Sequence, residues 1–127
     1  MLTAPPAAIR RSRILKYVRK IVALRQYAKQ VKKLLTVEER IAMETSIAEN
    51  PTLHPIISGT GGCRKARWGR GGSGKSGGVR AIFYFFVKGD TVFFLLLYAK
   101  NEMENLTDAE QKELKALAKS IEAADGP

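Results

Sequence analysis

Two neighbouring runs of aromatic and β-branched residues, 79–87 and 91–99, constrain this chain more than any other feature. Such residues fit the pleated, half-buried surface of a sheet, and the Lys-Gly-Asp sequence between the runs is typical of a turn. Side chains alternate between the two faces of a strand, so Arg80 and Tyr84 are expected on the same face. The runs therefore predict a long antiparallel hairpin.

A third strand is predicted just before the hairpin, over residues 62–68. Its alternation places Lys65 and Arg67 on one face and Ala66 and Trp68 on the other. The glycine-rich residues that follow, up to Gly78, are expected to form a mobile polar loop.

Helices are predicted on both sides of this β-rich segment. Thr36 and Thr107 are each followed three residues later by Glu, which is the pattern of a capping box at a helix start. Apolar residues at helical spacing follow both boxes. Upstream, residues 9–35 have the apolar period of one long basic helix, but residues 21–24 are equally an apolar run of strand type, after which the helix would begin only near Gln26.

The order of elements, helices followed by antiparallel strands and a last helix, predicts an α+β domain with its helices on one face of the sheet. We expect the other face to be exposed to solvent and basic, because it carries Lys65, Arg67, Arg80 and Tyr84. A chain of 127 residues has room for one such domain.

Positive charge dominates the chain, with 22 Lys and Arg against 12 Asp and Glu. Residues 1–35 carry ten Lys or Arg and no acidic residue, and the segment from Arg64 to Arg80 carries six and no acidic residue. Like charges at this density repel one another, so a polyanionic partner is expected, and nucleic acid phosphate is favoured over a merely solvated surface.

Several classes of protein are excluded by what the sequence lacks. The single cysteine, Cys63, allows no internal disulfide, and with one histidine, His54, there is no Cys/His cluster for zinc, so no metal and no cofactor is expected. The single cysteine also favours a reducing cytoplasm. The most apolar stretch, Val92–Ala99, is far shorter than the about 20 residues of a membrane span, which predicts a soluble protein without a membrane partner. Any catalysis must use Lys, Arg, Tyr and carboxylates.

Residues 69–76 match the nucleotide-binding pattern G-x-x-x-x-G-K-[ST]. In a phosphate-binding loop this pattern leads from a strand into a helix, whose N-terminus receives the phosphate. Here two glycines and a predicted strand follow, so nucleotide hydrolysis is not expected.

Three ordered blocks give the chain a resemblance to a known family. They are Gly59–Arg67, Gly74–Tyr84 and Tyr98–Glu102 with Leu106, preceded by Asn50-Pro51. Together they resemble the HigB-type branch of the RelE/ParE toxin superfamily, from about residue 20 to residue 121. The resemblance implies a first strand at 20–24, two helices, a twisted antiparallel sheet of three further strands and a C-terminal helix. It also implies a toxin domain at 20–123 and a basic N-terminal extension at 1–19.

Members of this superfamily are toxins of type II toxin–antitoxin modules. The resemblance implies a ribosome-dependent, metal-independent endoribonuclease that cuts mRNA in the ribosomal A site, and a cognate antitoxin that binds DNA. Two alternatives stay open, namely inhibition of DNA gyrase, as in the ParE branch, and RNA binding without catalysis.

Alignment with the family implies the site residues. Arg80 is expected to bind the scissile phosphate, and Lys65, Arg67 and Lys100 are expected to stabilise charge and transfer protons. The general acid and base remain open among Tyr84, Tyr98 and Glu102, because the family's arginine in the last strand segment is replaced by Asn101 and its C-terminal tyrosine has no counterpart. The RNA-binding residues are expected to be Arg64, Arg70, Lys75, Tyr84, Tyr98, Asn101 and Glu102.

Overall fold

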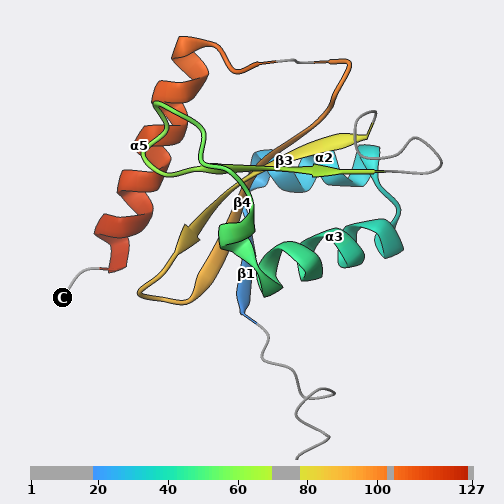
Figure 1. The fold of residues 1–127 in the computed structure, drawn as a ribbon, viewed down its shortest axis with the longest axis horizontal. Helices are drawn as coiled ribbons and strands as arrows, with labels where there is room; N and C mark the ends of the chain where they lie inside the picture. The colour runs from blue at the N-terminus through green and yellow to red at the C-terminus, as the bar shows by residue number, and fades with distance from the viewer. Residues whose placement is uncertain (1–18, 70–77, 103–104, 126–127) are drawn as a thin grey trace, which may run out of the picture.

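The computed structural model describes residues 19–69, 78–102 and 105–125. Its elements follow the chain in this order: β1 (Lys20–Ala23), α2 (Arg25–Leu34), α3 (Val37–Glu49), a short 3-10 helix η1 (Pro51–Leu53), β2 (Arg64–Trp68), β3 (Val79–Phe86), β4 (Thr91–Ala99) and α5 (Asp108–Asp125). The predicted α+β fold is confirmed, and the open choice at residues 9–35 is settled for 20–34 as a strand followed by a helix (Figure 1).

Four strands form one sheet in the order β1-β4-β3-β2. The predicted hairpin is β3 and β4, which pair antiparallel, and β2 pairs antiparallel with β3. The short β1 pairs parallel with the first half of β4, from Thr91 to Phe94. The register of β3 and β4 shifts at Leu95, where β4 has one extra residue, and such a bulge bends and twists the strand.

Both predicted capping boxes are present. At the start of α3, the Glu39 amide donates to the Thr36 hydroxyl at 3.1 Å, and the Thr36 amide donates to the Glu39 carboxylate at 2.9 Å. At the start of α5, the corresponding bonds between Thr107 and Glu110 are 3.1 and 2.8 Å. These bonds satisfy amides that no helical carbonyl can reach, which fixes where each helix begins.

Helices lie on both faces of the sheet. On one face, α2 and α3 pack through buried side chains such as Tyr27, Met43 and Ile47 against Phe83 and Phe94 of the strands. On the other face, α5 stands away from α2 and α3 (Figure 1) and packs its Leu114 and Ala118 against Ile82, Leu95 and Tyr98. The prediction that this second face lacks a helix is therefore wrong: its apolar half is covered by α5, and its basic half lies beyond the helix.

Two local contacts, one of Arg19 and one of Gly78, hold neighbouring segments of the chain together. The Arg19 guanidinium donates to Asp90 at 2.8 Å and to the Ala48 and Glu49 carbonyls at 2.7 and 3.0 Å, which ties the start of β1 to the β3–β4 turn and to the end of α3. At Gly78, an added Cβ would lie 1.9 Å from the Trp68 carbonyl oxygen, so only glycine allows the chain to enter β3 there. Among the described residues, no helix is long and apolar enough to cross a membrane.

Candidate functional site

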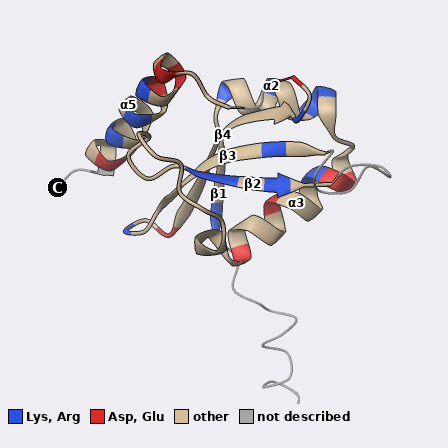
Figure 2. Cartoon of the chain, turned by 45° about the horizontal axis from the view of Figure 1, so that its top comes forward, with Lys and Arg blue, Asp and Glu red and all other residues tan. Residues whose placement is uncertain are grey.

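A row of three polar side chains crosses the sheet where β3 begins and β4 ends. Arg67 of β2 pairs with Arg80 of β3, and Arg80 pairs with Tyr98 of β4. Directly paired residues of antiparallel strands point to the same face, so these three side chains share the face that α5 only partly covers. Lys65 lies on the same face, two residues from Arg67 and opposite Ile82. Figure 2 shows basic residues on the neighbouring strands β2 and β3.

We call these three side chains, together with Lys65, the basic row (Lys65, Arg67, Arg80 and Tyr98). Its four members differ in their access to solvent. Arg67 is exposed and Lys65 is half-buried, whereas Arg80 is 7% exposed. One Arg80 guanidinium nitrogen donates to the Val79 carbonyl at 3.2 Å, which restrains the side chain. A buried guanidinium is poorly hydrated, and the effective dielectric constant around it is lower than in water. Its electrostatic attraction for an anion is therefore stronger than that of an exposed arginine.

Tyr98 is the neutral member of the basic row and is 6% exposed. Burial raises the pKa of its hydroxyl, Glu110 raises that pKa further, and Arg80 lowers it. Its hydroxyl has no hydrogen-bond partner among the described residues. Every buried side-chain polar atom of those residues has a partner, so the Tyr98 oxygen reaches solvent although the ring is buried.

The turn after β4 adds the predicted residues Lys100, Asn101 and Glu102 beside the basic row. The Lys100 amide donates to the Gly78 carbonyl at 3.0 Å, which brings this turn against the start of β3. All three side chains are exposed, and the Glu102 carboxylate accepts a hydrogen bond from the Ala99 amide at 3.1 Å. The structure thus brings Lys100 and Glu102 to the same end of the sheet as Arg80 and Tyr98.

Two predicted residues make structural contacts elsewhere. Arg64 precedes Lys65 and points to the opposite side of β2, where its guanidinium donates to the His54 carbonyl at 2.7 Å. Tyr84 shares the face of Arg80, as expected, but it lies under α5 and its hydroxyl donates to Glu122. Burial, followed by Glu122, raises the pKa of Tyr84 to about 12. Arg70 and Lys75, with the loop predicted around them, lie outside the described residues.

Three residues that sequence reasoning did not select, Gln26, Gln30 and Glu110, lie next to the site. With Leu96, Leu97, Tyr98 and Glu102 they line a pocket of about 270 Å³. The sequence marked Glu110 only as the capping residue of the last helix. Nothing in the pattern of residues 26–30 indicates that α2, which contains them, lies near Tyr98. Among the described residues, no group of three or more His, Cys, Asp or Glu side chains could hold a metal ion.

The fold is the α+β arrangement of the RelE/ParE toxin superfamily. Residues 19–126 match the family model described as RelE toxin of the RelE / RelB toxin-antitoxin system, and the chain therefore belongs to the RelE toxin family. The HigB-type branch stays a prediction.

Solved structures of RelE are similar to this chain, and one of them supports the fold. The isolated RelE toxin of E. coli is 14% identical over 78% of this chain and 98% of its own, with a TM-score of 0.51. A double mutant of E. coli toxin RelE in the free state is 16% identical over 83% of this chain and 98% of its own, with a TM-score of 0.49. The intact E. coli RelBE toxin–antitoxin complex gives 16% identity over 62% of this chain and 93% of the matched chain, with a TM-score of 0.49.

Proposed function

We propose that this chain is the toxin of a type II toxin–antitoxin pair and acts as a ribosome-dependent, metal-independent endoribonuclease on mRNA. The observation that carries the proposal is the basic row, in which Arg67 and Arg80 occupy paired positions on one face of the sheet. Two guanidinium groups at paired positions can bind one anion together, and an RNA phosphate is such an anion.

The reaction needs no nucleophile from the protein, because RNA carries its own. The 2′-hydroxyl loses its proton and attacks the adjacent phosphorus, and the bond to the 5′-oxygen of the next nucleotide breaks. That oxygen takes up a proton, so the products are a 2′,3′-cyclic phosphate and a 5′-hydroxyl. The protein must supply a proton acceptor, a proton donor and cations for the charge that develops on the phosphate.

The role that we assign to each cation follows from how exposed it is to solvent. The more accessible cations are suited to the first contacts with the phosphates of the RNA backbone. They are exposed Arg67, half-buried Lys65 and exposed Lys100 in the neighbouring turn. Arg80, restrained and poorly hydrated, is suited to stabilising the charge that develops on the scissile phosphate.

Tyr98 is the best supported of the three candidates for proton transfer. Tyr84 is already bonded to Glu122, and the Glu102 carboxylate already accepts from the Ala99 amide. The Tyr98 hydroxyl has no partner among the described residues, and Tyr98 pairs in register with Arg80. A hydroxyl in this position can exchange a proton with an RNA oxygen.

The implied partners are translated mRNA in the ribosomal A site and a cognate, DNA-binding antitoxin, and the implied compartment is the cytoplasm. The family model names an antitoxin, RelB, for the toxins it describes. A positive charge of +10 on this chain favours contacts with rRNA and mRNA during A-site entry.

The proposal is tested by expressing the chain without the gene beside it and mapping mRNA ends in the arrested cells. We expect cuts within translated codons that leave 5′-hydroxyl ends, and the same cuts in a purified translation system containing EDTA-treated protein. Arg80→Gln is expected to slow cleavage about 100-fold or more, as for the loss of one main stabilising donor. Lys20→Gln, on an exposed residue of β1 at the far end of β4, serves as the matched control.

Three results would refute the proposal. Gyrase inhibition without mRNA cleavage would favour the ParE-like alternative. Ribosome binding with intact mRNA would favour a non-catalytic RNA-binding module. Full cleavage by Arg80→Gln, with a folded state shown by circular dichroism, would remove the basic row from the mechanism.

A further inference from the structure

Glu102 has no part in the mechanism above, although it ends the turn that carries Lys100. Its carboxylate oxygen Oε1 accepts from the Ala99 amide at 3.1 Å, and its own amide donates to the Ala99 carbonyl at 3.0 Å. The second bond joins residues three apart and closes a β-turn, with Lys100 and Asn101 as its central residues. Glu102 therefore satisfies both polar backbone groups of Ala99.

The backbone of Ala99 needs such a partner because it lies at an open edge of the sheet. β1 pairs with β4 only from Thr91 to Phe94, so on that side no strand of the described chain pairs with the last residues of β4. The Lys100 amide donates toward β3, so the Ala99 amide points to the opposite edge. Ala99 is 3% exposed, and a buried amide without an acceptor is costly.

The same turn holds the backbone of Lys100 against the start of β3. The Gly78 carbonyl, which accepts from the Lys100 amide at 3.0 Å, lies two residues before Arg80. The turn is thus fixed by β3 on one side and by Glu102 on the other. A lysine on a fixed backbone can place its ammonium group in fewer positions, so less conformational entropy is lost when it binds a phosphate.

We propose that Glu102 is a positioning residue, which holds the turn so that Lys100 reaches the RNA backbone beside Arg80. The inference rests on the proposed nuclease function, and it replaces the RNA binding and the proton transfer expected for Glu102 from the resemblance. A carboxylate repels the phosphates of RNA, which disfavours direct binding of the RNA backbone by Glu102. Its bond to the Ala99 amide does not need the charge, because a neutral amide oxygen can accept the same hydrogen bond.

The test compares Glu102→Gln with Glu102→Ala on ribosomes programmed with an mRNA that the wild-type chain cuts. Gln keeps an oxygen for the Ala99 amide, so we expect a single-turnover cleavage rate within about twofold of wild type and an unchanged pH profile. Ala has no acceptor, and we expect cleavage about tenfold slower, because a small misplacement of a charged group is enough for such a loss. A proton-transfer role predicts instead that Glu102→Gln is as slow as Glu102→Ala.

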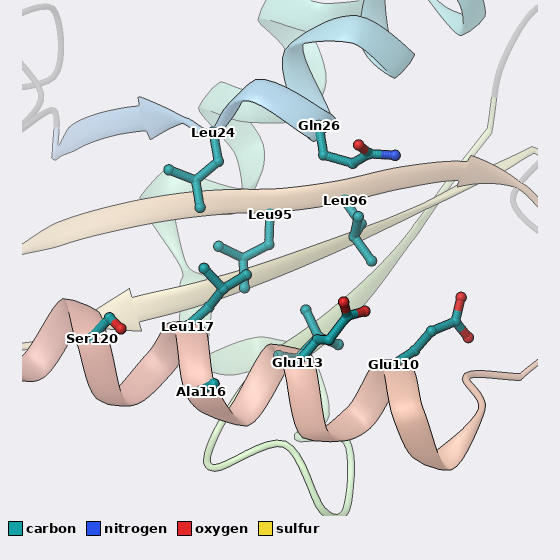
Figure 3. A pocket seen from close by; sticks show the side chains of 10 residues that line it. Leu24, Gln26, Leu95, Leu96, Glu110, Glu113, Ala116, Leu117 and Ser120 are labelled. Carbon is teal, nitrogen blue, oxygen red and sulfur yellow. The ribbon is translucent and has the colours of Figure 1, made fainter.

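Glu113→Ala is the matched control for the lost charge. Glu113 is an exposed residue of α5 that lines the pocket between this helix and β4 (Figure 3), away from the turn after β4. We expect Glu113→Ala to cut mRNA at the wild-type rate.

A double variant shows whether Glu102 acts through Lys100. Lys100→Gln alone is expected to slow cleavage about tenfold, and adding Glu102→Ala should slow it by no more than a further twofold or about that, since residues that act as one unit are not additive. Hydrogen exchange of the Ala99 amide, followed by NMR, gives a readout independent of activity. This amide should exchange about tenfold faster in Glu102→Ala and at the wild-type rate in Glu102→Gln.

Any one of five results would overturn the inference. They are a loss of about 100-fold in Glu102→Gln, wild-type cleavage by Glu102→Ala, unchanged Ala99 exchange in Glu102→Ala, an equal loss in Glu113→Ala, and full additivity in the double variant. If circular dichroism shows that Glu102→Ala does not fold, the rate and the pH profile of Glu102→Gln decide by themselves. Failure of the wild-type chain to cut any mRNA would instead refute the proposed function.

Discussion

At the scale of single residues, Tyr84 and Tyr98 differ in whether the hydroxyl is already hydrogen-bonded within the domain. Both tyrosines lie on the face of the sheet that α5 partly covers. The Tyr84 hydroxyl is bonded to Glu122 of α5. The Tyr98 hydroxyl has no such bond among the described residues and is under the electrostatic influence of Arg80 and of Glu110, in the first turn of α5. The position of α5 along the sheet therefore decides which tyrosine is available to a substrate.

Cys63 gives a prediction about pH at the same scale. Its side chain is fully buried, and burial raises the pKa of the thiol to about 11. In the unfolded chain the thiol loses its proton near its ordinary pKa of about 8.5, so the folded state holds the proton more tightly. The stabilising contribution is complete below that pH and is lost as the pH rises toward 11.

We therefore expect the free energy of unfolding to fall between about pH 9 and pH 11, with a contribution of about 1–2 kcal/mol from Cys63. Urea titrations at several pH values measure this fall. The raised pKa of Tyr84, about 12, also makes the free energy of unfolding fall at high pH. The Cys63→Ala variant is therefore needed to separate the contribution of the thiol from that of the tyrosine. An equally steep fall in the Cys63→Ala variant would show that the thiol plays no part in it.

At the scale of elements, the capping boxes fix where α3 and α5 begin. Removing the Thr36 hydroxyl leaves the Glu39 amide without its acceptor, so Thr36→Ala is expected to lower the free energy of unfolding by about 1 kcal/mol. Thr45→Ala is the matched control, because Thr45 is exposed within the same helix and alanine has the higher helix propensity. Thermal and urea unfolding compare the two variants. A similar loss of stability in both would mean that the box contributes nothing beyond helix propensity.

Most elements could be predicted from the sequence because their signals are local. The capping boxes, the hairpin of β3 and β4 and the alternation within β2 depend on residues close together in the chain. The face on which α5 packs could not be predicted in this way. The spacing of Leu114 and Ala118 shows that α5 has an apolar side, but a helix after the last strand can reach either face of a sheet. The apolar residues Ile82 and Leu96, on the same face as Lys65, were the available sign that this face is half covered.

The candidate site was predictable in part for the same reason. Alternation within a strand was enough to place Lys65 and Arg67 together. The pairing of Arg80 with Tyr98 could not be predicted in this way, because without the extra residue at Leu95 the hairpin would place Arg80 opposite Leu97. Gln26 and Glu110 come from helices near opposite ends of the domain sequence, and only the packing of α2 and α5 around β4 makes them neighbours of one pocket. Tertiary packing of this kind leaves no local pattern in the sequence.

At the scale of the whole molecule, charge is distributed unevenly around the site. The chain has a net charge of +10, and the basic row lies at one end of the sheet. The pocket beside this row is lined by carboxylates and amides. An RNA strand crossing this end of the sheet would place its phosphates over the basic row, because the carboxylates of the pocket would repel them.

This separation predicts how binding responds to salt. The affinity for a short RNA, with 2′-deoxy substitution at the cleaved linkage to prevent cutting, should fall with rising KCl concentration, because each neutralised phosphate of a single strand adds about 0.7 to the slope of log K against log salt. Fluorescence anisotropy measures this slope.

Exposed Arg67 is expected to neutralise one phosphate, so Arg67→Gln should lower the slope by about 0.7. Lys20→Gln removes an equal charge from β1, opposite Thr91 at the far end of β4, where screening leaves it little effect. Equal slopes for the wild-type chain and Arg67→Gln would mean that RNA does not lie across the basic row.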